Sequence, residues 1–192
     1  MCGRFYIAED GDTGLQEIIR ALNRKGTQVK TGEVRPGDST AVIANNKSLQ
    51  PAPFAMPWGF AMTDGKLIIN ARSETAAGKP MFRDGMLQRR CLIPASHYFE
   101  WEKRQREKVK YAIKPAESGM LFMAGLYRIE GNKARFTILT RTPAEPIAFI
   151  HDRMPVILPH AALQDWLNPR YNAADVLRAA VTDVTFAPEQ AI

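Results

Sequence analysis

Cysteine is scarce in this sequence, which holds only Cys2 and Cys91 among 192 residues. Two cysteines so far apart exclude a disulfide framework and favour a reducing compartment, for which we predict the cytoplasm. No apolar run approaches the ~20 residues that cross a bilayer, so we expect no membrane partner. The N-terminus also lacks a basic region followed by an apolar stretch, which predicts that there is no signal peptide.

Histidine is nearly as scarce, with three in the chain. Together with two cysteines, these scattered histidines give no metal-ligand spacing, so we predict no metal and no cofactor. Repeats and low-complexity tracts are also missing. We therefore expect one domain over residues 1–192, and a monomer.

What is present is an ordinary globular composition, 45% hydrophobic and 24% charged, with 9% aromatic residues that argue against disorder. The net charge is +6 and the pI is about 9.5. That charge fits a polyanionic partner such as nucleic acid, although many small proteins are mildly basic.

Hydrophobic periodicity predicts many short strands and few helices. Residues 13–25 form the clearest helix, because Leu15, Ile18, Ile19 and Leu22 recur at helical spacing and Thr13 begins a capping-box pattern. Strands are expected at residues 40–44, 48–57, 66–69, 90–94, 95–102, 111–113, 121–128 and 134–140, helices at 80–90, 159–167 and 172–180, a loop at 31–38 and a charged turn at 103–108. This order predicts an α+β domain whose antiparallel strands curl into a barrel-like core with a few flanking helices.

The N-terminus carries the most distinctive chemistry. If Met1 is removed, Cys2 presents a free α-amine beside its thiol, a pair that can condense with an aldehyde to give an imine and then a thiazolidine ring. An α-amine titrates near pH 8 and a free thiol near pH 8.5, so a minority of each is nucleophilic at neutral pH. Arg4 places a fixed charge nearby that suits a phosphate. The alternative is that Cys2 is an ordinary terminal thiol.

Further polar residues interrupt apolar strand patterns at three places. Asn70 either ends a strand or offers its amide to a sugar hydroxyl, and Arg72 is either a surface charge or a phosphate ligand. Glu100 either lies on an exposed strand face or is a partly desolvated carboxyl that donates and accepts protons. Trp101 next to it is either part of the core or a platform on which an unpaired base stacks.

The third place is the segment around His151. This histidine is either structural or a proton shuttle near neutral pH, and Arg153 is a further candidate phosphate ligand. Cys91 lies within an apolar run and is interpreted as a core thiol.

Together, these segments resemble the SRAP family, the SOS-response-associated peptidases. The resemblance rests on residues 1–5, 34–37, 58–59, 70–75, 90–94, 99–101, 123–126 and 151–155, which occur in the order typical of the family. The chain departs from the family pattern at Gly32-Glu33, where many relatives carry Tyr-Asn, and after Gly59.

The resemblance implies an activity on DNA. Members of the family recognise abasic sites in single-stranded DNA and link to them reversibly through a thiazolidine at the N-terminal cysteine. It implies that Cys2 is the nucleophile, that Asn70 orients the opened sugar, and that Glu100 and His151 transfer protons. It also implies that Arg4, Arg72, Trp101 and Arg153 hold flanking phosphates and bases, and that a peptidase activity removes Met1.

Two other hypotheses stay open at this stage. One is a cysteine peptidase in which the Cys2 thiol acts with His151 and the amine is dispensable. The other is a non-catalytic domain that binds single-stranded DNA through basic and aromatic residues alone.

Overall fold

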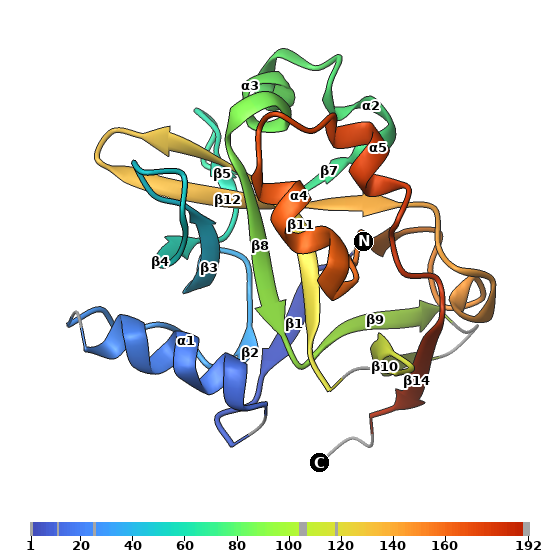
Figure 1. Ribbon diagram of the computed structural model, residues 1–192. Helices are drawn as coiled ribbons and strands as arrows, with labels where there is room; N and C mark the ends of the chain where they lie inside the picture. Colours follow the sequence, from blue (N-terminus) through green and yellow to red (C-terminus); the bar gives the residue numbers. More distant parts are fainter. Residues whose placement is uncertain (1, 11, 25, 104–106, 118, 190–192) are drawn as a thin grey trace.

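Residues 2–10, 12–24, 26–103, 107–117 and 119–189 are described by the computed structural model (Figure 1). Its first half contains β1 (Arg4–Ile7), α1 (Thr13–Asn23), β2 (Gly32–Val34), β3 (Ser39–Asn45), β4 (Pro51–Pro57), β5 (Phe60–Ala61), β6 (Leu67–Ile68), β7 (Asn70–Arg72), α2 (Ser73–Ala76) and α3 (Pro80–Gln88). The second half contains β8 (Arg90–Ala95), β9 (His97–Lys103), β10 (Lys108–Pro115), β11 (Leu121–Glu130), β12 (Lys133–Arg141), η1 (Glu145–Ile147), β13 (Met154–Pro155), η2 (His160–Ala162), α4 (Leu163–Leu167), α5 (Ala173–Leu177) and β14 (Val184–Pro188).

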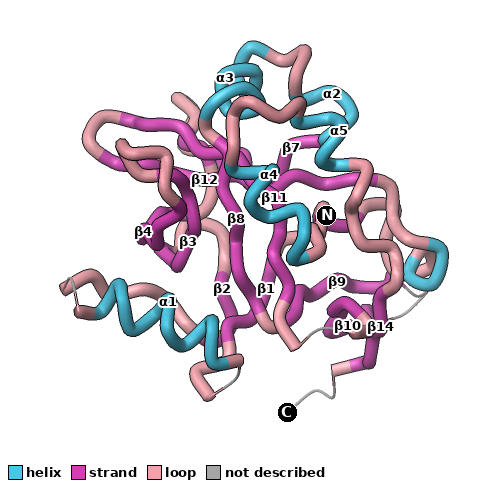
Figure 2. Tube along the Cα trace, in the orientation of Figure 1, coloured by secondary structure: helices cyan, strands magenta, loops and turns pink. Residues whose placement is uncertain are grey.

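Two larger sheets and one hairpin organise these strands. A five-stranded antiparallel sheet has the order β14-β10-β9-β1-β2. A seven-stranded sheet has the order β13-β12-β11-β8-β3-β4, with β7 added to β12 as a parallel strand. The hairpin consists of β5 and β6. Figure 2 shows the helices at the periphery of these strands.

The prediction of a barrel-like core has to be corrected, because this topology contains open sheets. Within the described residues no sheet closes on itself, because the five-stranded sheet ends at β14 and β2 and the larger one at β13 and β4. The fold is an α+β arrangement dominated by open antiparallel sheets. Side chains from both sheets, such as Phe5 and Ile138, enter one hydrophobic cluster. Short alternating strands are common to barrels and to open packed sheets, so the sequence pattern could not separate them.

The helix predicted at residues 13–25 is confirmed as α1, which buries Leu15 and Leu22. Its cap differs from the prediction, since Asp12 is the N-cap and its side chain accepts the backbone N–H of Gly14 at 2.8 Å. The Asx cap satisfies the Gly14 N–H, one of the unpaired amides of the first turn, and the Gln16 N–H is accepted by the backbone oxygen of Asp12 at 3.1 Å.

Most strands lie near their predicted positions, but several short elements were missed. β2 lies inside the predicted loop at residues 31–38, and β14 follows the last predicted helix. The predicted charged turn at residues 103–108 falls between β9 and β10, and its residues 104–106 lie outside the described part of the chain. No helix of the described residues is both long enough and apolar enough to cross a membrane.

Candidate active site

Cys2 lies two residues before the start of β1 and is fully buried. Its Sγ is 3.7 Å from the backbone oxygen of Arg4. Asn70, from β7, donates a side-chain amide hydrogen to the backbone oxygen of Cys2 at 2.9 Å. Because β7 is a parallel partner of β12, the seven-stranded sheet holds the amide that positions the N-terminal segment.

Glu100 reaches the same region from β9. It is 3% exposed, so the carboxyl stands in a desolvated environment. Burial raises its pKa to about 7, and the negative charge of Asp152 adds to that effect. The carboxyl is therefore present in both protonation states near neutral pH, as an acid–base group requires.

The pKa of the Cys2 thiol is shifted in the same direction as that of Glu100. Burial raises its pKa far above the ordinary range, and the charge of Glu100 raises it further. The thiol is consequently protonated at neutral pH, and it needs a nearby base before it can react as a thiolate.

Tyr98 belongs to this environment, although the sequence analysis did not single it out. It lies two residues before Glu100 on β9 and opposite Phe5 on β1. Its hydroxyl is buried without a hydrogen-bond partner among the described residues. Burial, followed by the charges of Cys2 and Glu100, raises its pKa. The i, i+2 spacing that puts Tyr98 on the Glu100 face of the strand was the available signal.

His151 follows η1 and is oriented by its own loop. Its Nδ1 accepts the backbone N–H of Arg153 at 3.1 Å and lies 2.7 Å from Oδ1 of Asp152. The electrostatic effect of Asp152 on Glu100 relates this loop to the buried carboxyl.

Arg153 is engaged by protein groups. Its guanidinium forms a bidentate ion pair with Glu74 at 2.7 and 2.8 Å and also donates to the backbone oxygen of Thr140 at 2.7 Å. The side chain is 11% exposed. Arg72 lies opposite Thr140 in the β7–β12 pairing and is exposed. The DNA contacts expected of Arg72 and Arg153 stay predictions, with Arg72 the more accessible of the two.

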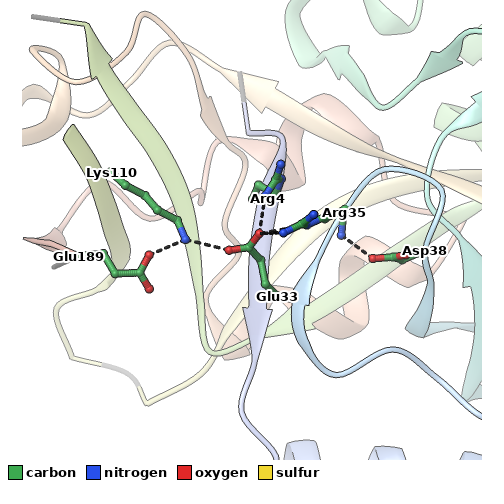
Figure 3. A network of polar contacts seen from close by, with 6 residues as sticks. All are labelled: Arg4, Glu33, Arg35, Asp38, Lys110 and Glu189. Atoms are coloured by element: carbon green, nitrogen blue, oxygen red, sulfur yellow. Dashed lines mark hydrogen bonds and ion pairs between the residues drawn. The ribbon is translucent and has the colours of Figure 1, made fainter. Parts of the chain in front are cut away.

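Arg4 and Trp101 meet on the outer face of the five-stranded sheet. The Arg4 guanidinium carbon lies 5.9 Å from the centroid of the Trp101 ring. Arg4 also forms an ion pair with Glu33, a residue of the predicted loop at which the chain departs from the family pattern (Figure 3). The sheet thus separates Arg4 and Trp101 from Glu100, which lies on the opposite face of β9.

Cys91 is placed apart from this chemistry. It is the second residue of β8, pairs with Gly125 of β11 and is fully buried. No cluster of three potential His, Cys, Asp or Glu metal ligands occurs in the part of the chain that the structure describes.

Comparisons with known proteins agree over almost the whole chain. Residues 1–189 match the profile of a family described as SOS response associated peptidase (SRAP). The chain is 34% identical over 191 residues to the abasic site processing protein YoaM of Bacillus subtilis, covering 93% of this chain and 84% of that protein. It is 28% identical over 193 residues to the abasic site processing protein YedK of Escherichia coli, covering 95% and 86%. A solved structure of a Bacteroides thetaiotaomicron protein matches the fold with a TM-score of 0.77 at 20% identity, covering 98% and 92%.

Proposed function

This chain belongs to the SRAP family, and we propose that it processes abasic sites in single-stranded DNA by forming a reversible covalent link through Cys2. One observation carries the proposal: Asn70 holds the backbone of Cys2 in a site that contains a buried carboxyl, Glu100, with a pKa of about 7. The proposal requires removal of Met1, which lies outside the described residues. Self-cleavage of that peptide bond would agree with the family's description as peptidases.

The reaction joins an aminothiol to the aldehyde of the ring-opened abasic sugar. The α-amine of Cys2 attacks the aldehyde carbon, and loss of water gives an imine. The thiol then adds to the imine carbon, the new carbon–sulfur bond closes a thiazolidine, and the thiol proton passes to the ring nitrogen. Reversal follows the same steps backwards, so no oxidant or cofactor is needed.

Each of the buried groups carries out a different part of the reaction. Glu100 protonates the sugar ring oxygen as the ring opens, and it accepts the proton of the Cys2 thiol as the thiazolidine closes and passes it to the ring nitrogen. His151 moves protons during imine formation and reversal. Asn70 keeps its amide on the Cys2 carbonyl, and its Oδ1, which is buried without a partner among the described residues, accepts a hydroxyl of the opened sugar.

Flanking nucleotides would be held by the basic residues. Arg4 and Arg72 contact phosphates, and Trp101 stacks on an unpaired base. Arg153 supports the neighbouring phosphate site through its ion pair with Glu74 and its hydrogen bond to the backbone oxygen of Thr140. A single-stranded substrate needs no base extrusion from a duplex, which would cost a few kcal/mol.

The low acidity of the Cys2 thiol favours this reaction over the cysteine peptidase alternative. A thiolate-led peptidase needs a lowered thiol pKa, whereas burial raises that of Cys2. Amine-first chemistry tolerates a protonated thiol until the imine has formed.

The test is a denaturing gel of the protein incubated with single-stranded DNA that carries one abasic site. We expect a heat-stable shifted band without borohydride in the wild type. Cys2→Ala should abolish the band, and Cys2→Ser should give a species that survives only after borohydride reduction, because the hydroxyl closes the ring poorly. Cys91→Ala is the matched control and should keep the band, since Cys91 is buried on β8 of the seven-stranded sheet, whereas Cys2 precedes β1 of the five-stranded sheet. An extra residue retained before Cys2 should also abolish it.

The outcomes separate the hypotheses. Salt-sensitive binding without any covalent band would support a non-catalytic DNA-binding domain. Turnover of peptides by a protein with a blocked amine would support a cysteine peptidase. Intact mass spectrometry supplies a further check, since the reactive species should be lighter than the full chain by one methionine.

A further inference from the structure

Three cations converge on one carboxylate on the outer face of the five-stranded sheet (Figure 3). Glu33 forms an ion pair with Arg4, accepts from Arg35 at 3.2 Å through the same oxygen, and accepts from Lys110 at 2.8 Å through the other. These contacts lower the pKa of Glu33 to about 2, with the Lys110 hydrogen bond as the largest cause. Glu33 is therefore ionised throughout the neutral range.

The strand register brings these residues together from four places in the sequence. Glu33 lies opposite Tyr6 on the β1–β2 ladder, so Arg4 is its diagonal neighbour. Lys110 lies opposite Trp101 on the β9–β10 ladder. Arg35 follows β2, where its backbone N–H is accepted by Asp38 at 2.8 Å. Arg4 and Lys110 are thus held by strands of the sheet, and Arg35 is held in a turn by the hydrogen bond to Asp38.

Two of the cations are also held by aromatic rings. Lys110 Nζ lies 3.7 Å from the centroid of the Phe99 ring and 5.8 Å from that of Trp101, and Arg4 lies 5.9 Å from Trp101. Cation–π attraction is independent of Glu33. The cations would therefore keep their places if another anion replaced the carboxylate.

The cluster is open to solvent. Side-chain exposure is 33% for Arg4, 62% for Arg35, 23% for Lys110 and 25% for Glu33. The other carboxylate–arginine pair of the site differs, because the Arg153 side chain is only 11% exposed. Lys110 has a second carboxylate partner, Glu189, at 2.5 Å. Three cations thus face three carboxylates, since Asp38 accepts the backbone N–H of Arg35, and a further anion has to take the place of one of these carboxylates.

We propose that Arg4, Arg35 and Lys110 form a binding site for a backbone phosphodiester of single-stranded DNA, and that Glu33 occupies the phosphate position until DNA displaces it. A carboxylate and a phosphodiester each present two anionic oxygens to charge-assisted donors. Trp101 beside the site offers a ring to the base attached to that phosphate. The choice of DNA as the source of the phosphate rests on the function proposed above.

The test is the affinity for undamaged single-stranded DNA, measured by fluorescence anisotropy over a series of salt concentrations. Glu33→Gln removes the competing charge, so we expect affinity to increase by at least about fivefold. The slope of log K against log salt should stay the same, because the same phosphate is contacted with and without the Glu33 charge. Glu17→Gln is the matched control, since Glu17 is exposed on α1 and the charge change is the same; its effect should stay below about twofold.

A second variant keeps the test informative if Glu33→Gln destabilises the fold. Arg35→Gln removes an exposed cation of the site and should weaken binding and reduce the slope by about 0.7. An affinity gain no larger than that of Glu17→Gln would overturn the proposal, and so would weaker binding by a folded Glu33→Gln protein. Because the strand carries no abasic site, this result is independent of cross-linking. Tightening by Glu33→Gln without any covalent band in the wild type would keep the phosphate site and refute the cross-linking function.

Discussion

Glu100 is a carboxyl in an environment that disfavours its charged form. A carboxylate loses hydration when it is buried, and this loss outweighs the interactions that stabilise the charge, so its pKa rises to about 7. Such a group is costly for folding but useful for proton transfer at neutral pH. The sequence placed Glu100 between two aromatic residues, which was consistent both with an exposed strand face and with a buried one. The second alternative is confirmed by its 3% exposure.

Replacing this carboxyl should therefore separate chemistry from binding. Glu100→Gln keeps the size of the side chain but cannot exchange a proton, so we expect adduct formation to slow by about 10²-fold. The dissociation constant for undamaged single-stranded DNA should change by less than about twofold. Single-turnover gels and anisotropy on the same preparation measure the two quantities. Equal losses in both would assign Glu100 a structural role instead.

At the scale of elements, β11 shows how closely the central strands approach one another. Gly125 lies between Cys91 of β8 and Ile138 of β12. A methyl group on Gly125 would clash with Ile93, would come within 2.9 Å of the backbone oxygen of Thr137, and would lie 3.1 Å from the Cys91 sulfur. Backbone oxygen in a sheet ladder cannot move aside, so only glycine fits at this point.

Gly125→Ala should consequently destabilise the protein by about 2–3 kcal/mol, the usual cost of overpacking a core. Urea unfolding measures the change. Gly78→Ala is the control, because a methyl group there would meet only the backbone oxygen of Thr75 at 3.7 Å. Its free energy of unfolding should stay the same or increase by about 0.4–1 kcal/mol. Equal stability of the two variants would show that β8 and β12 can separate around β11.

At the scale of the whole molecule, stability depends on pH through carboxyls whose pKa values are shifted in opposite directions. Ion pairs lower the pKa of Glu33, paired with Lys110 and Arg4, and of Glu74, paired with Arg153, to about 2 in each case. Each therefore contributes stability that is present above its unfolded pKa of 4.5 and is lost as the pH falls towards 2. Glu100 has the opposite sign: its folded pKa of about 7 lies above the unfolded value of 4.5, so its contribution is fully present below pH 4.5 and is lost as the pH rises to 7.

Differences between wild type and variants should isolate these contributions. Relative to Glu100→Gln, the wild type should lose about 3 kcal/mol of unfolding free energy between pH 4.5 and pH 8. Relative to Glu33→Gln, the wild type should instead gain stability as the pH rises from 2 to 4.5, and the difference should stay flat above it. Urea unfolding of the three proteins at pH 3, 4.5 and 8 provides the measurement. A pH-independent difference for Glu100→Gln would contradict the raised pKa.

Some features of this protein follow from local sequence patterns, and others depend on contacts between residues that are far apart in the sequence. The sequence alone identified the helix at α1, most strands and the family and predicted an aminothiol at Cys2, because these depend on residue identity, on periodicity and on the order of short motifs. It did not reveal that Asn70 donates to the carbonyl of Cys2, that Glu33 gathers three cations, or that the sheets stay open. Those features depend on strand order and on side chains that meet across several strands. A periodic pattern reports which face of a strand is buried, and only the tertiary structure determines what that face is buried against.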